Sequence, residues 1–137
     1  LRDASAKRPW MHVLEPILGY LLLAENLSLD CSFSGAWNFG PTYEDSIKVE
    51  SIANYLIRAL NGSIEVRYAD APVAETGCLL LDSAKSLKYL NWKTKLSIDE
   101  ALGLVVEWKN SVDKGIPPFQ VTAEQIRQYS GYKSNYG

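Results

Sequence analysis

A run of apolar residues with helical spacing constrains the fold of this chain more than any other feature. Its apolar positions follow the i, i+3, i+4, i+7, i+8 pattern of one helix face, and they are Leu14, Ile17, Leu18, Leu21 and Leu22. The pattern predicts an amphipathic helix over residues 14–27. Pro16 suits its first turn, where a missing N–H costs nothing. Residues 7–13, directly before the helix, hold an arginine, a tryptophan and the only histidine of the chain.

The same spacing returns farther along the chain and predicts more helices. They are expected over residues 49–60 and 83–90, after a capping box formed by Ser97 and Glu100, and after a second capping box at residues 122–125. Short buried or alternating runs predict strands at residues 36–39, 64–68 and 78–81. The sum is a small α/β domain with more helix than strand, covering residues 1–129, with a mobile tail at residues 130–137.

Length and composition limit the classes of function. A chain of 137 residues suits one domain, and a net charge of -2 predicts no general affinity for nucleic acid. The longest apolar run is far shorter than the roughly 20 residues that span a membrane. Cys31 and Cys78 are expected to be reduced thiols in a cytoplasmic protein. Because the chain opens on Leu1 without a methionine, we expect a piece of a longer protein.

Several catalytic motifs are matched only in part. One histidine and two cysteines do not supply a zinc site, and no G-x-S-x-G elbow supports a catalytic triad. Residues 35–42 have the glycine spacing of a P-loop, but Pro41 stands where the lysine is needed. Tyr89 and Lys93 match a bare Y-x-x-x-K pattern at a helix end, which we interpret as coincidence. With no dinucleotide fingerprint either, we predict no catalytic residue and no metal site on this chain.

Five residues remain as candidates for binding: Arg8 together with Trp10 and His12, then Asn38, and Glu75. The Arg8 guanidinium can hold two phosphate oxygens at once, and His12 lies at a helix start, where the helix dipole favours anions. Asn38 is polar where its short run is otherwise apolar. Three of them also have a structural interpretation: Arg8 as a surface arginine, His12 as a cap at the helix entry, and Asn38 as a turn former.

Several segments together resemble one family. RPWMHVLEPILGYLLLAENL at residues 8–27 and GAWNFGP at residues 35–41 are the most specific of them. The D-S-A-K stretch at residues 82–85, the L-N-W at residues 90–92, and the patterns at residues 96–108 and 122–129 follow in the same order. The chain thereby resembles the C-terminal part of the CDP-glucose 4,6-dehydratases, extended short-chain dehydrogenase/reductases that act on nucleotide sugars.

The resemblance implies a fold and a set of roles. This chain would be the helix-rich substrate-binding part, without the Rossmann core that holds NAD and the catalytic groups. Arg8 would bind the pyrophosphate, Asn38 would support the nucleotide side of the pocket, and Glu75 would face the ribose or base. Trp10 and His12 would shape the wall behind Arg8. The parent enzyme would convert CDP-glucose to its 4-keto-6-deoxy product by passing a hydride to NAD and back.

The chain also departs from the family pattern. Met11 replaces a common glutamine, Ala74 replaces a histidine, residues 77–78 replace a His-Tyr pair, and Asn91 replaces the glycine of L-G-W. Two other hypotheses therefore stay open: a related enzyme for a UDP-, GDP- or dTDP-sugar, and a stand-alone interaction domain without enzymatic activity. We expect the chain alone to be inactive and to self-associate, because half of an interdomain pocket leaves apolar surface exposed.

Overall fold

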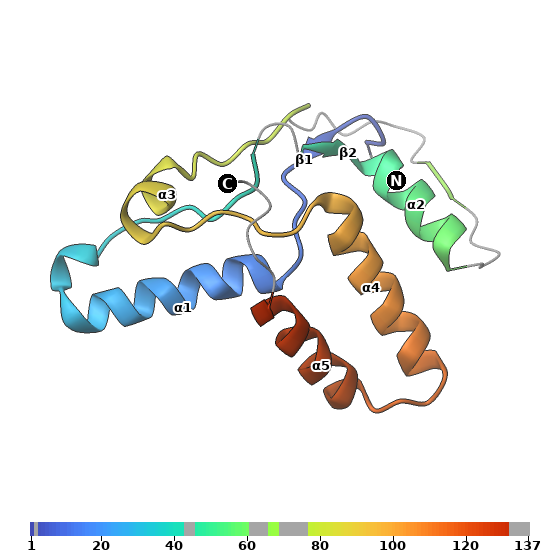
Figure 1. Ribbon diagram of the computed structural model, residues 1–137. Coiled ribbons are helices and arrows are strands. Elements are labelled where there is room, and N and C mark those ends of the chain that lie inside the picture. Colours follow the sequence, from blue (N-terminus) through green and yellow to red (C-terminus); the bar gives the residue numbers. More distant parts are fainter. Residues whose placement is uncertain (2, 43–45, 61–65, 69–76, 132–137) are drawn as a thin grey trace.

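The computed structural model describes residues 1, 3–42, 46–60, 66–68 and 77–131, and these residues are mainly helical (Figure 1). Glu75 and Ala74 lie outside the described residues. The elements in chain order are β1 (Lys7–Arg8), α1 (Leu14–Leu29), the 3-10 helix η1 (Cys31–Phe33), β2 (Ile47–Lys48), α2 (Val49–Ala59), α3 (Ala84–Leu90), α4 (Ile98–Asp113) and α5 (Pro118–Gly131). The helix-rich character expected from the sequence is confirmed.

The sheet is much smaller than predicted. In the part of the chain that the structure describes, it consists of β1 and β2, paired antiparallel with Lys7 opposite Lys48 and Arg8 opposite Ile47. Residues 36–39 and 79–81 are not strands, nor are residues 66–68, while residues 64 and 65 lie outside the described part. Cys78 makes only a single parallel bridge to Lys7.

The segment at residues 36–39 is extended because side chains, not a neighbouring strand, satisfy its backbone. The Ser86 hydroxyl donates to the Asn38 carbonyl, and the Gly40 N–H donates to Ser83 Oγ at 2.8 Å. Phe39 is buried beneath α1. A short apolar run predicts burial, but burial alone does not distinguish a strand from an extended segment held by a helix.

Helix α1 confirms the helix predicted at residues 14–27, and three of its five predicted apolar positions, Leu14, Leu18 and Leu22, pack against the core. Ile17 and Leu21 are 42% and 63% exposed, whereas Glu15 and Gly19 are buried. A Cβ placed on Gly19 would lie 2.4 Å from the Phe39 ring, so only glycine admits this close approach. The helix therefore turns a carboxylate and a glycine toward the core and leaves two of its apolar residues outside.

Helix α3 ends in a left-handed turn. Asn91 has φ 49° and its N–H donates to the Ser86 carbonyl, which closes the helix. The turn reverses the chain directly, and Leu90 and Trp92 on its two sides are both buried.

Helices α4 and α5 form an antiparallel pair (Figure 1). The capping box of Ser97 and Glu100 at the start of α4 is confirmed, with both reciprocal hydrogen bonds present. The predicted start of the last helix at Thr122 is wrong, because α5 begins at Pro118. A proline is favoured at the first helical position, so the Pro-Pro pair begins this helix instead of merely breaking the chain. Residues 130 and 131 belong to α5.

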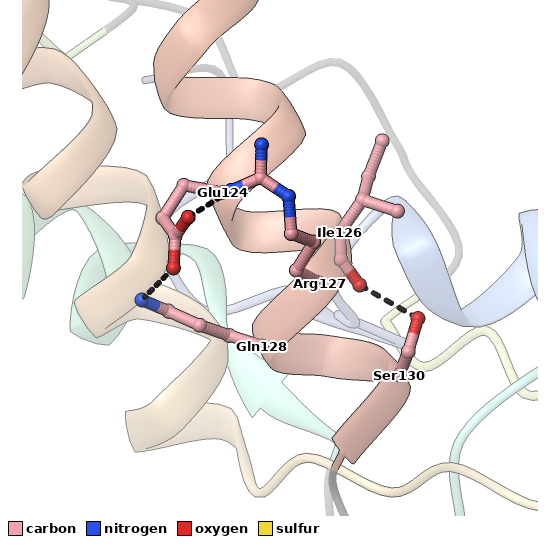
Figure 2. Close-up of polar contacts among 5 residues, drawn as sticks. All are labelled: Glu124, Ile126, Arg127, Gln128 and Ser130. Carbon is pink, nitrogen blue, oxygen red and sulfur yellow. Dashed lines mark hydrogen bonds and ion pairs between the residues drawn. The ribbon is translucent and has the colours of Figure 1, made fainter.

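The two faces of α5 differ in chemistry. Val121, Gln125 and Tyr129, four residues apart, are buried. On the outer face, Arg127 and Gln128 donate to the Glu124 carboxylate, and the Ser130 hydroxyl donates to the Ile126 carbonyl (Figure 2). Such exposed pairs within one helix contribute only a few tenths of a kcal/mol each, about 0.2–0.5. The outer face is therefore a solvated surface.

Buried apolar side chains gather in two groups. The first, here the aromatic cluster, consists of Phe39, Leu90 and Trp92. The second, here the Glu15 cluster, consists of Leu96, Leu104 and Tyr129, with the Glu15 carboxylate among them. Leu18 of α1 packs against both clusters and joins them into one core. In the described ranges, no helix combines the length and the apolar character needed to cross a bilayer.

Candidate functional site

The β1–β2 ribbon carries the first two candidate residues. Arg8 is half-buried, and its Nη1 donates to the Lys7 carbonyl at 2.9 Å. The Trp10 indole Nε1 donates across the ribbon to the Ile47 carbonyl at 3.2 Å, and the Trp10 N–H donates to the Arg8 carbonyl at 2.9 Å. Trp10 therefore fixes the end of the strand from which the Arg8 side chain extends.

The ribbon concentrates positive charge. Lys7 and Lys48 are directly opposite partners, next to Arg8. Like charges at opposed positions of an antiparallel pair repel each other, and a bound anion would relieve that repulsion. The pKa of the Asp3 carboxyl is lowered, mainly by the hydrogen bond from the Ser5 hydroxyl and then by bonds from backbone N–H groups. The positive charge of Arg8 makes the smallest contribution to this lowering. Because side chains alternate along a strand, the Lys7–Lys48 pair and Arg8 add positive charge to opposite faces of the ribbon.

His12 lies in a different environment, at the entry of α1. It is 8% exposed, and its Nδ1 accepts a hydrogen bond from the Leu14 N–H at 3.3 Å. Burial lowers the pKa of His12, which favours the neutral ring. The ring lines a cavity between the start of α1, α4 and α5. The helix-entry interpretation of His12 is therefore what the geometry shows.

Asn38 lies in a third environment, beside the loop before α3. Its side chain is exposed, and its Nδ2 donates to the Asp82 carbonyl at 3.1 Å. A cavity of about 230 Å³ lies nearby, lined among others by Pro41, Ser83 and Lys93. The structure thus places the four described candidates in three local environments, and Glu75, the fifth, falls outside the described residues.

The glycines at residues 35–42 do not form a phosphate cradle. A Cβ on Gly40 would meet the Leu81 Cβ at 2.6 Å, so this glycine serves close packing. Its N–H is already bonded to Ser83 Oγ. The Gly40 N–H is therefore not available to a phosphate. Among the described residues, no group of three or more His, Cys, Asp or Glu could hold a metal ion.

Glu15 is the polar residue that the sequence analysis missed. Its Oε1 accepts from the N–H groups of Lys95 and Leu96, both at 2.8 Å, and its Oε2 accepts from the Tyr129 hydroxyl at 2.8 Å. Burial and, after it, the contact with Glu15 raise the pKa of Tyr129. The Trp92 indole donates to the Glu15 carbonyl at 3.1 Å. Because these bonds join α1, α5 and the loop before α4, Glu15 is a structural residue.

A signal for Glu15 does exist in the sequence. Glu15 lies three, four and seven residues before Leu18, Gly19 and Leu22, on the same helical face. A carboxylate on a face that is otherwise apolar or small indicates a buried, hydrogen-bonded acid, since an unpaired one would be too costly.

The segments that carry the family resemblance pack on one another. Glu15 meets Trp92 through the indole N–H, and Asn38 meets Ser86. Lys85 Nζ lies 4.1 Å from the centre of the Trp37 ring and donates to the Ala36 carbonyl. The residues that resemble the family therefore form one connected set of contacts.

Comparison with known proteins gives one informative match. No family model matches the chain. The chain is 31% identical, over an alignment 141 positions long, to the CDP-glucose 4,6-dehydratase of Salmonella typhimurium. The alignment covers 94% of this chain and 36% of that protein, so the chain spans about a third of its relative's length.

Proposed function

We propose that this chain is the nucleotide-sugar-binding part of a protein related to the CDP-glucose 4,6-dehydratases. The observation that carries the proposal is the 31% identity that extends over 94% of the chain. The packing of the resembling segments on one another supports it, because these segments form one connected part of this chain's core.

In this proposal, Arg8 binds the pyrophosphate of the nucleotide sugar. Its fork can bind two oxygens at once, and the opposed Lys7 and Lys48 add positive charge to the same ribbon. Trp10 keeps the strand end in place through its bond to Ile47. A guanidinium on a fixed strand end suits a phosphate better than a neutral ligand.

The remaining candidates have supporting roles in the proposal. Asn38 fixes the loop at the nucleotide side through its bond to the Asp82 carbonyl. His12 holds the entry of α1 through its bond with the Leu14 N–H, away from Arg8. Glu75 would face the ribose or base. Hydride transfer to and from NAD would belong to a Rossmann part outside this chain, since the chain matches only 36% of its relative's length. We therefore assign no catalytic step to this chain and expect it to be inactive alone.

A second candidate function has its own observation. Val13, directly before α1, and Tyr20 and Leu21 on α1 are 62%, 60% and 63% exposed. Apolar side chains gathered on one helix face indicate a protein contact. This supports self-association of the chain, and it is also what a stand-alone interaction domain would show.

The test is a titration of the chain with CDP-glucose, followed by NMR chemical shifts. We expect weak binding, in the millimolar range, because one charge-assisted contact contributes roughly 1.5–3 kcal/mol. Arg8→Ala should weaken binding about tenfold or more, and Arg8→Lys should recover only part of it, since lysine cannot bind two oxygens at once. Arg127→Ala is the matched control, because Arg127 pairs locally with Glu124 on the outer face of α5.

The outcomes separate the hypotheses. Binding of UDP-, GDP- or dTDP-glucose in preference to CDP-glucose would keep the site and change the substrate. Equal loss in Arg8→Ala and Arg127→Ala would remove the phosphate role of Arg8. No binding of any nucleotide sugar, together with association at high protein concentration, would favour the interaction domain.

A further inference from the structure

A cavity of about 240 Å³ lies where the start of α1 meets the α4–α5 pair. Its walls are mainly apolar and include Leu14, Val105 and Trp108. Val105 is 43% exposed, so it lies at the rim. A dry apolar cavity of about 150 Å³ is enough to bind benzene, so this one has room for a substituted ring.

The polar groups of the cavity are mostly occupied within the protein. The Trp108 indole donates to Thr122 Oγ1 at 3.0 Å, and the Gln125 amide nitrogen donates to the Leu104 carbonyl at 2.8 Å. His12 is the exception. Its Nδ1 accepts from the Leu14 N–H, which places the proton of the neutral ring on Nε2. No hydrogen-bond partner for Nε2 comes from the residues that the structure describes.

The His12 side chain is nine-tenths buried, but its Nε2 is not fully buried, so this N–H is open to the cavity. A ligand that fills the cavity must accept this hydrogen bond or leave the donor unpaired at a cost. None of the residues lining the cavity is charged at neutral pH, because His12 is held neutral by burial. The cavity therefore does not suit a phosphate or any other ion, and its ligand differs from the nucleotide sugar proposed above.

We propose that this cavity binds a small uncharged aromatic molecule, which packs against Trp108 and accepts a hydrogen bond from His12 Nε2. The site is independent of the Arg8 ribbon, so the two proposals stand or fall separately. It combines an apolar wall with one convergent polar group, the usual composition of a small-molecule site.

The test uses phenol and toluene, which have the same shape but differ by a hydroxyl group. Each is titrated into the labelled 137-residue chain, with the imidazole signals of His12 and the indole signals of Trp108 followed by NMR. Both probes should shift these signals. Val105→Trp should weaken both about tenfold or more by filling the cavity. The matched control is Ile126→Trp, since Ile126 is similarly exposed, at 47%, but does not line the cavity.

His12→Phe tests the hydrogen bond. The preference for phenol relative to toluene should fall about fivefold, the value of one neutral hydrogen bond. Should this variant fail to fold without its contact to the Leu14 N–H, the Val105→Trp result still decides whether the cavity is the site. Unshifted His12 and Trp108 signals at saturating probe would overturn the proposal. So would native affinity in Val105→Trp, or an unchanged phenol preference in a folded His12→Phe variant.

Discussion

The aromatic cluster and the Glu15 cluster lie on either side of Leu18 and are held by different forces. In the first, Phe39 meets Trp92 edge-to-face, with ring centres 5.0 Å apart, and meets Tyr20 in the same way at 5.4 Å. In the second, one carboxylate accepts three hydrogen bonds from groups brought together by the fold. Ring contacts lose energy gradually as side chains shrink, whereas a buried carboxylate leaves several donors unpaired when it is removed.

The largest expected effect follows from removing that carboxylate. Glu15→Ala should lower the free energy of unfolding by about 3–5 kcal/mol, because two backbone N–H groups and the Tyr129 hydroxyl lose their acceptor. Glu15→Gln should cost clearly less, since its amide oxygen can still accept from Lys95 and Leu96. Urea unfolding followed by tryptophan fluorescence measures both. Equal and small losses in the two variants would mean that packing, not the carboxylate, holds this cluster.

A smaller loss is expected from crowding the aromatic cluster. Gly19→Ala places a methyl group against the Phe39 ring and should destabilise by about 1–3 kcal/mol. Gly103→Ala is the matched control: it also lies within a helix, but its Cβ would meet nothing within 4 Å. This control should be neutral or stabilising by up to about 1 kcal/mol, because alanine favours helix. Similar thermal unfolding of the two variants would argue against a tight contact at Gly19.

The Glu15 cluster also predicts a dependence on alkaline pH. The pKa of Tyr129 is raised above its ordinary value of about 10, so the folded chain keeps the hydroxyl proton that the unfolded chain loses. Stability from this group is therefore complete below pH 10 and falls as the pH rises above it. Urea midpoints measured upward from pH 9 should fall less steeply in Tyr129→Phe than in the native chain. Parallel slopes would show that other tyrosines cause the decline.

The smallest effect belongs to a local contact. Ser97→Ala removes half of the capping box of α4 and should cost about 1 kcal/mol. Ser130→Ala removes only the bond to the Ile126 carbonyl on the outer face of α5 (Figure 2) and should stay within about 0.5 kcal/mol. Circular dichroism during thermal unfolding compares the two. A loss in Ser97→Ala as large as that in Glu15→Ala would mean that the cap, too, holds the tertiary structure.

The parts of the fold that depend on neighbouring residues were predictable from the sequence. The helix predicted at residues 14–27 and the capping box at Ser97 are both confirmed, since each needs only interactions within a few residues. The strand at residues 36–39 was predicted wrongly, because its partners are serines more than 40 positions away. The start of α5 was placed too late, because a second plausible cap at Thr122 concealed the start at Pro118.

The candidate site was less predictable, for the same reason. Arg8 and His12 are close in the sequence, but β1 and the turn into α1 place them on different surfaces. Glu15 depends on groups from residues 95, 96 and 129, and no local pattern brings these together. The roles of Arg8, Trp10, Asn38 and Glu75 in binding stay predictions for the titrations above.

The left-handed turn at Asn91 has a consequence for how sequences of this kind can vary. Leu90 and Trp92 are both buried because position 91 takes φ 49°, which glycine adopts freely and asparagine tolerates. The family motif that the chain resembles has glycine at this position, so the replacement by asparagine can keep the same backbone conformation. Few residue types are therefore tolerated at position 91. Glycine, asparagine and aspartate are compatible with the left-handed turn, whereas a β-branched residue would force the two buried neighbours apart.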